Sequence, residues 1–158
     1  MRKLGVLLSF LALAYIGVVA SGCEEGEWDE PKISYHGDDE SHNWGMNCMD
    51  CHRRGGPGEG WFTVAGSVSK LGTNEPYPNV TIELWKEIGV GEPIAIIEVD
   101  ALGNFYTTEP INWGDGLYPA VVSKNGDRVF MPYKTMIGAC NSCHFNGEGV
   151  NAPPIWAK

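Results

Sequence analysis

Hydrophobic and polar residues alternate through the middle of this chain, over residues 61–133. Val80, Ile82 and Leu84, for example, fall on one side of an extended segment, with polar neighbours between them. Alternation with a period of two is typical of strands that bury one face. The pattern predicts strands over residues 62–68, 80–85, 94–99, 104–108, 117–124 and 128–131.

Turn-forming residues separate these segments. Gly91-Glu92-Pro93 precedes the third, and Asn125-Gly126, a strong hairpin signal, lies between the last two. Several short strands at this spacing, with no long helical pattern between them, favour an antiparallel β-sandwich. We therefore expect a mainly β protein, with a small antiparallel β-sandwich over residues 61–133.

The segments that flank the sandwich lack this alternation. Residues 23–40 are rich in Glu, Asp and Gly and poor in aliphatic residues, which is typical of a flexible acidic tether. Residues 41–60 include a run of turn formers from Arg53 to Gly60, and residues 134–158 end in an extended strap marked by Pro153-Pro154. Both of these segments are expected to be irregular.

The first 22 residues have the pattern of an export signal. Two basic residues precede an apolar run over residues 4–19, and three small residues, Ala20-Ser21-Gly22, lead to Cys23. A membrane-spanning helix is the alternative, but a span needs about 20 apolar residues and this run is shorter. We expect residues 1–22 to be removed as a signal peptide.

Cys23 is the odd cysteine of five, and its position after small residues resembles the lipobox of bacterial lipoproteins. The resemblance implies a diacylated cysteine that becomes the new N-terminus and anchors the chain to a membrane. Glu24, in place of aspartate, is compatible in that family with delivery to the outer membrane. Ala20 stands where leucine is commoner, so ordinary cleavage that releases a soluble protein is the alternative. We expect a lipid-anchored protein on the periplasmic or extracellular side of the cell envelope.

The charge balance limits the partners of this chain. It has 11 basic and 20 acidic residues, a formal net charge of −9, and losing the two basic residues of the signal makes it more acidic. Such a surface repels phosphate backbones, which argues against a nucleic-acid role. An acidic surface keeps a protein soluble or steers it toward a basic partner.

Two motifs of the same form carry the candidate chemistry, Cys48-Met49-Asp50-Cys51-His52 and Cys140-Asn141-Ser142-Cys143-His144. Both match C-x-x-C-H, the pattern of covalent haem attachment. Each cysteine adds to one vinyl group of the porphyrin, and the histidine lies beneath the iron as its axial ligand. The sequence therefore predicts two covalently bound haem c groups. The predicted cofactor-binding residues are Cys48, Cys51, His52, Cys140, Cys143 and His144.

Other uses of these cysteines fit less well. The two C-x-x-C halves lie about 90 residues apart, whereas zinc ribbons separate them by roughly 15–20. A thioredoxin-like redox pair is expected near a βαβ pattern, which is missing here, and it needs no histidine after the second cysteine. Disulfide bonds are the remaining alternative, and they leave the two histidines unexplained.

The remaining histidines are candidates for the other axial position of each iron. The chain has four histidines, so after His52 and His144 two are left, His36 and His42. The count fits two bis-histidine haems, although the spacing does not say which histidine serves which iron. Methionine is the competing ligand and would raise the reduction potential. Candidate methionines flank both motifs: Met46, Met49, Met131 and Met136.

Two resemblances extend these expectations. Covalent attachment at C-x-x-C-H, in an exported chain, resembles the multihaem c-type cytochromes, which carry electrons in bacterial envelopes. Gly66-Ser67-Val68, Pro78-Asn79-Val80 and the turn over residues 100–105, Asp-Ala-Leu-Gly-Asn-Phe, resemble the carboxypeptidase-regulatory-like modules. The second resemblance implies a small prealbumin-like sandwich and carries no catalytic residues.

Electron transfer to and from redox partner proteins is the function that these features favour. A sandwich can bring its chain ends together, and both motifs lie just outside those ends, so we expect the two haems to be neighbours. A dihaem peroxidase or reductase is the alternative enzyme, and it would need one iron with an open position. A β-sandwich adhesion or binding lipoprotein is the third possibility.

Overall fold

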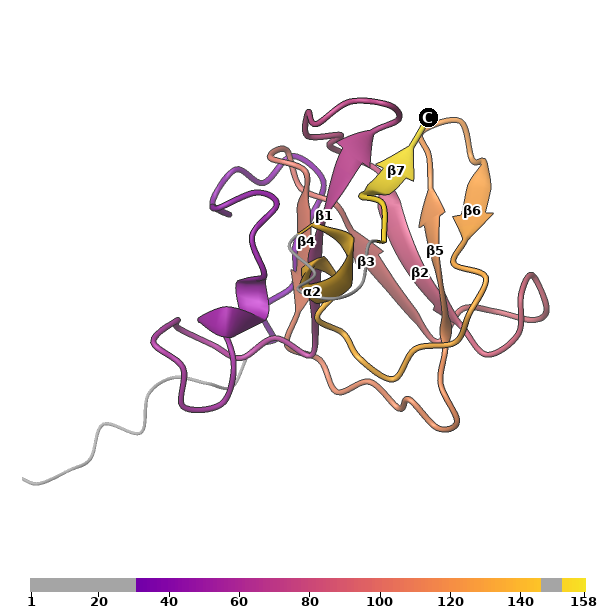
Figure 1. Ribbon diagram of the computed structural model, residues 1–158. Coiled ribbons are helices and arrows are strands. Elements are labelled where there is room, and N and C mark those ends of the chain that lie inside the picture. The colour runs from indigo at the N-terminus through magenta and orange to yellow at the C-terminus, as the bar shows by residue number, and fades with distance from the viewer. Residues whose placement is uncertain (1–30, 146–151) are drawn as a thin grey trace, which may run out of the picture. The chain divides into compact units, whose positions relative to one another are not determined.

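The computed structural model describes residues 31–145 and 152–158 (Figure 1). The expected signal peptide, the lipidated Cys23 and residues 24–30 of the tether lie outside the described residues. Within the described part, no helix has the length and apolar character needed to cross a membrane.

The protein is mainly β, as the alternation predicts. The strands are β1 (Val64–Lys70), β2 (Thr81–Trp85), β3 (Ala95–Glu98), β4 (Asn104–Thr107), β5 (Tyr118–Val122), β6 (Arg128–Phe130) and β7 (Ile155–Ala157). The first six coincide with the six predicted strands to within two residues at every end. Two short helical turns complete the described elements, the 3-10 turn η1 (Cys48–Asp50) and α2 (Asn141–His144).

The strands form two sheets, ordered β4-β1-β7 and β3-β2-β5-β6. Every neighbouring pair is antiparallel except β1 and β7, which are parallel. The expected hairpin joins β5 to β6, and Gly126 takes the left-handed conformation (φ +88°) that an Asn-Gly turn requires. The sequence predicted an extended strap at the C-terminus but not its pairing with β1.

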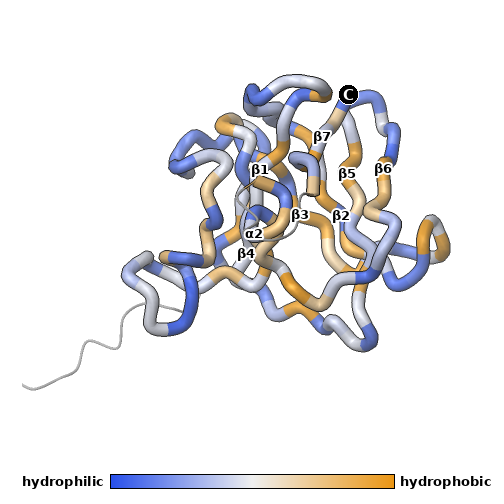
Figure 2. Tube along the Cα trace, in the orientation of Figure 1, coloured by the Kyte–Doolittle hydropathy of each residue, from blue (hydrophilic) through white to orange (hydrophobic). Residues whose placement is uncertain are grey.

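The core lies between the two sheets. Val64, Val68 and Phe105 come from the first sheet, and Leu84 and Ile97 are among the residues that meet them from the second. All five are at most 1 % exposed. Burying each such side chain contributes about 1.5–3 kcal/mol, so this layer dominates the stability of the sandwich. Figure 2 shows the hydrophobic stretches along these strands and the polar loops outside them.

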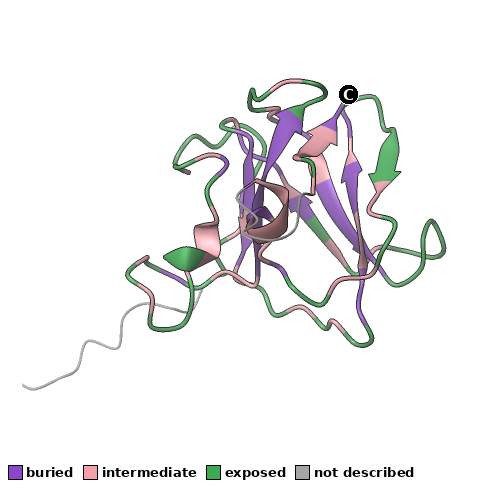
Figure 3. Cartoon of the chain, in the orientation of Figure 1, coloured by how far each residue is buried: buried purple, intermediate pink, exposed green. Residues whose placement is uncertain are grey.

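Strand β1 is buried on both faces, which simple alternation does not predict. Its first six residues are all buried, and Figure 3 shows this along the strand. Val64 and Val68 enter the core, so Ala65, Ser67 and Ser69 lie on the opposite face. Because these three residues are small, other segments of the chain can pack closely on that face. The segments that do so carry the two C-x-x-C-H motifs.

The last residues assigned to the tether also lie against the sandwich. Ile33 forms an antiparallel bridge with Thr107 of β4, and the backbone of Ser34 donates a hydrogen bond to the Tyr106 carbonyl. The Ser34 side chain is fully buried. Strand-like pairing with the sheet is therefore present at Ile33, before the first motif.

Candidate functional site

The two C-x-x-C-H segments lie beside each other against β1, although the whole sandwich separates them in sequence (Figure 1). The second motif is held by a parallel bridge between Ala65 and Ala139, and the backbone of Cys140 donates to the Ala65 carbonyl at 3.0 Å. The side chain of Asn141 reaches the first segment and donates to the Met46 carbonyl at 2.8 Å. The structure thus brings both motifs to one side of the sheet.

Each motif forms one helical turn with the same backbone hydrogen bonds. In the first, the N–H groups of Cys51 and His52 both donate to the Cys48 carbonyl, at 3.2 and 2.9 Å. In the second, the N–H groups of Cys143 and His144 donate to the Cys140 carbonyl, at 3.2 and 3.1 Å. Residues three and four apart on a helical turn share a side. The turn therefore gathers two thiols and one imidazole around a single position.

The histidine of each motif is oriented by backbone carbonyl groups. Nδ1 of His52 lies 3.0 Å from the carbonyl oxygen of Glu59 and 3.3 Å from that of Gly60, and Nδ1 of His144 lies 2.6 Å from that of Pro153. Since a carbonyl only accepts, Nδ1 carries the proton in both rings and Nε2 carries the free lone pair. Metal-binding histidines are held in this way, because the second hydrogen bond fixes the tautomer and makes the ligand more basic.

Glycines allow these close approaches. A Cβ at Gly58 would lie 2.8 Å from Nδ1 of His52, so only a residue without a side chain lets this loop pass over the ring. A Cβ at Gly138 would lie 1.9 Å from the Thr63 carbonyl oxygen, so glycine is required where the second motif joins β1. The sequence predicted a loop over residues 53–60, but glycine content alone did not show what the loop contacts.

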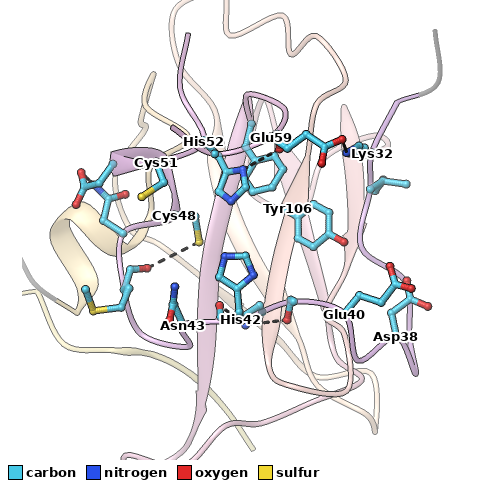
Figure 4. Close-up of a pocket in the computed structure, with 18 of the residues that line it drawn as sticks. Lys32, Asp38, Glu40, His42, Asn43, Cys48, Cys51, His52, Glu59 and Tyr106 are labelled. Atoms are coloured by element: carbon cyan, nitrogen blue, oxygen red, sulfur yellow. Dashed lines mark hydrogen bonds and ion pairs between the residues drawn. The ribbon is translucent and has the colours of Figure 1, made fainter. Parts of the chain in front are cut away.

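A pocket of about 840 Å³ opens beside the first motif. This volume is within the range of roughly 300–1,000 Å³ that is usual for ligand sites. Cys48, Cys51 and His52 line it together with His42, and Figure 4 shows the two imidazoles near each other with Cys48 beside them. The centres of the two rings are 5.8 Å apart. A metal ion bound by one nitrogen of each ring, at the roughly 2 Å of metal–imidazole bonds, needs ring centres about 6 Å apart.

The other predicted ligand, His36, is placed differently. Its Nε2 lies 2.9 Å from the Val80 carbonyl oxygen, and its Nδ1 lies 3.8 Å from a carboxylate oxygen of Glu98. His36 is not among the residues that line the pocket. Of the competing methionines, Met46 lines the pocket and Met136, just before the second motif, is 61 % exposed.

The motif cysteines are free thiols in the described structure. Burial raises the pKa of Cys140 to about 12, and the neighbouring Cys48 and Cys143 thiols add to the shift. Burial also raises the pKa of Cys48, with further contributions from Asp100 and Asp50. A redox-active cysteine is used as its thiolate and has a lowered pKa. The environment of these two thiols is therefore the reverse of what a thiol redox pair needs.

Aromatic side chains extend from the pocket wall. Phe62 stacks on His52 with ring centres 4.4 Å apart, and Tyr106 stacks on Phe62 at 4.7 Å. The strand predicted over residues 62–68 included Phe62, but the strand begins only at Val64. Near the second motif, Trp44 packs edge to face on Phe145 at 5.0 Å. Each motif therefore has an aromatic pair packed beside it.

Each motif presents two thiols and one Nε2, the groups through which a covalently attached metal–porphyrin would be held. Such a site needs only one or two protein ligands per metal ion, because the porphyrin supplies the rest. Within residues 31–145 and 152–158, no group of three or more His, Cys, Asp or Glu side chains is placed to enclose a bare metal ion. Comparisons with protein-family models, with curated proteins and with solved structures find no match to this chain.

Proposed function

We propose that this protein is a dihaem c-type cytochrome that transfers electrons and is anchored to a membrane through a lipid on Cys23. One observation carries the proposal. Both C-x-x-C-H segments form the same turn and lie side by side, and the Nδ1–H group of each histidine donates a hydrogen bond to a backbone carbonyl. A thiol redox pair would not require this orientation of the histidines. A zinc site would need at least three protein ligands around the ion, and residues 31–145 and 152–158 contain no such group.

In this proposal, the cysteines attach the haems and the histidines bind the irons. Cys48 and Cys51 bind the first haem and Cys140 and Cys143 the second, with His52 and His144 as the proximal ligands. When bound, each haem supplies reversible one-electron chemistry at its iron. The protein fixes the ligands, excludes water on the side of Phe62 and Trp44, and holds the two groups close enough for electrons to pass between them.

The sixth ligands follow from the placement of the remaining histidines. His42 lies opposite His52, so we assign it to the first iron. His36 is the histidine left for the second iron, and ligation there requires it to give up its contact with the Val80 carbonyl. Bis-histidine ligation lowers the reduction potential relative to His/Met ligation.

The remaining features of the chain fit an envelope protein. The export signal and Cys23 deliver it to the outer side of the inner membrane or to the outer membrane, where haem is attached in the cytochromes that it resembles. The prealbumin-like sandwich is the scaffold that brings the two motifs together. The partners are then redox proteins, with no nucleic acid involved.

The contact between His36 and Val80 also favours a second candidate, a dihaem peroxidase or reductase. If His36 stays on the Val80 carbonyl, the second iron has an open position, which such an enzyme needs. A high-spin second haem that binds cyanide and turns over peroxide would identify the enzyme. A carrier gives two low-spin haems and no turnover.

A mass measurement of the mature protein, together with its reduced-minus-oxidised spectrum, tests the proposal. We expect the mass of two haems, the acyl chains on Cys23, and absorption bands typical of haem c. Replacing Cys48 and Cys51 by alanine removes one haem, and replacing Cys140 and Cys143 removes the other. A colourless protein without added porphyrin mass, from cells that mature other c-type cytochromes, would refute it.

A further inference from the structure

Three buried polar side chains connect the two motifs. Asn141 and Ser67 are fully buried, and Asn104 is 3 % exposed. Asn141 belongs to the second motif, Ser67 to β1, and Asn104 to β4, where it lies directly opposite Ser67 in the sheet register. Burying a polar group lowers the stability of the fold unless its hydrogen bonds are satisfied, so the partners of all three side chains matter.

The amide of Asn141 is fully used. Its Oδ1 accepts from the backbone N–H of Ser67 at 3.0 Å, and its Nδ2 donates both to Ser67 Oγ, at 2.9 Å, and to the Met46 carbonyl, at 2.8 Å. The last bond joins the second motif to the segment that leads into the first. Asn141 therefore links three separate pieces of chain.

Ser67 and Asn104 continue the connection toward His42. Ser67 Oγ accepts from the backbone N–H of Gly45 at 2.9 Å and donates to Asn104 Oδ1 at 2.7 Å. Asn104 Nδ2 donates to Ser41 Oγ, at 2.9 Å, and to the His42 carbonyl, at 3.4 Å. The hydrogen bonds thus run without a break from the second motif to the backbone of the candidate ligand of the first haem.

The turn after His42 needs such support. Asn43 and Gly45 both have positive φ, +53° and +80°. A non-glycine residue in this region is held there by the surrounding structure. A Cβ at Gly45 would also lie 3.2 Å from the Phe145 ring, just after the second motif. The conformation that presents His42 is therefore in contact with the second motif.

We propose that Asn141, in the second haem segment, sets the orientation of His42 on the first iron through Ser67 and Asn104, and that all three are positioning residues. The inference rests on the function proposed above and deepens it, because it makes the ligand geometry of one haem depend on a residue of the other motif. Asn141 touches neither haem ligand directly and acts through Ser67, Asn104 and the Met46 carbonyl.

The test uses the full-length chain with Cys140 and Cys143 both replaced by serine, so that only the first haem is attached. Asn141→Ala is added to this parent, and the ferric haem is examined by electron paramagnetic resonance. That spectrum depends on the angle between the two axial imidazole planes, which a general loss of stability does not alter. We expect shifted g values or a high-spin fraction several-fold above that of the parent.

Ser67→Ala is the second variant, because it breaks the same connection from β1 if the Asn141 variant does not accumulate. Ser123→Ala is the matched control, since Ser123 is also a buried serine but bonds only within the β5–β6 turn, to Asn125 and Asp127. Its spectrum should equal that of the parent. Parent-like spectra from Asn141→Ala or from Ser67→Ala, with haem attached, overturn the inference and leave the proposed function intact. A wild-type chain without haem overturns both.

Discussion

The imidazole rings of His42 and His52 lie near each other in one pocket, with centres 5.8 Å apart and planes inclined by 43°. His52 belongs to the first C-x-x-C-H turn, and His42 comes from the segment before it. The separation is close to what two imidazoles on one metal ion require. In the cytochrome proposed above, these two histidines would hold the first iron between them.

Replacing His42 by alanine should therefore convert the first haem from low spin to high spin. The ferric absorption spectrum measures the change, and added imidazole should restore the low-spin form. His36→Ala should leave the first haem unchanged, because His36 contacts Val80 and Glu98 rather than the pocket. A low-spin first haem in the His42 variant contradicts the assignment. If His36→Ala makes the second haem high spin, His36 is its ligand.

Gly58→Ala should raise the reduction potential of the first haem. A Cβ there meets Nδ1 of His52 at 2.8 Å, so the loop must withdraw and the bond to the Glu59 carbonyl weakens. The imidazole then becomes a poorer electron donor to iron, which favours the ferrous state. We expect a shift of about 60 mV, a tenfold change in the one-electron equilibrium, by spectroelectrochemical titration.

Gly91→Ala is the control for this experiment. Gly91 has a positive φ and open space around it in the β2–β3 loop, so alanine costs backbone strain without touching either motif. It should lower the melting temperature slightly and leave the potential unchanged. Equal potentials in the Gly58 variant and the wild type would show that the carbonyl contact does not tune the iron.

Gly138→Ala should disturb the second haem selectively. The added methyl group would overlap the Thr63 carbonyl oxygen, which forces residues 138–140 away from β1. The Cys140 N–H then loses the Ala65 carbonyl, and the second turn loses its support. We expect a mass that retains the first haem, with incomplete attachment or altered ligation of the second. Loss of the first haem alone would contradict this reading of the bridge.

The salt bridge between Glu83 and Arg128 should make stability depend on acidic pH. The two side chains meet at 2.6 and 3.1 Å on the outer face of the second sheet. The Arg128 guanidinium, and then the Trp85 N–H, hold the pKa of the Glu83 carboxyl below its usual value. A lowered folded-state pKa contributes stability that is complete above the unfolded-state pKa, near 4.5, and is lost as pH falls through the lower value.

Glu83→Gln should therefore lower the melting temperature by a few degrees at pH 7 and by less at pH 3. Asp115→Asn is the control, because Asp115 forms its salt bridge with Lys134 while 88 % exposed, and such pairs contribute little. Thermal unfolding followed by circular dichroism at both pH values measures the effect. An identical loss at pH 7 and pH 3 would mean that the charge on Glu83 is not what stabilises the sheet.

The sequence predicted the sheet strands well because the residues that enter the core alternate with polar ones, even where the other face is also covered, as in β2 and β4. Val80, Ile82 and Leu84 alternate with polar residues, and that pattern depends only on which side meets the core. The helical turn of each motif was not part of the prediction, which expected both flanking segments to be irregular. Strand β7 was not predicted, because it has only three residues and pairs with β1 through its backbone. The preceding Pro153-Pro154 neither favours nor prevents this pairing.

The pairing of His42 with His52 could not be predicted in the same way. In the sequence, His36 and His42 both have polar neighbours. In the structure, the path of the chain along β4 and the turn at Asn43 place only His42 beside His52. The carbonyl groups that orient His52 and His144 have no sequence signal, because every residue has a carbonyl. The double burial of β1 was hidden for a related reason, since its covered face consists of small residues.

The covered face of β1 sets how far the two motifs lie from the core. Ala65 and Ser67 are small, so only a thin layer of side chains separates the hydrophobic interior from the two cysteine turns. A larger side chain at Ala65 would lift the second turn outward while leaving the first where Phe62 and Tyr106 hold it. If the two haems proposed above are bound, exchanges among small residues at this one strand would change the gap between them, and with it the speed of electron exchange, without rebuilding the sandwich.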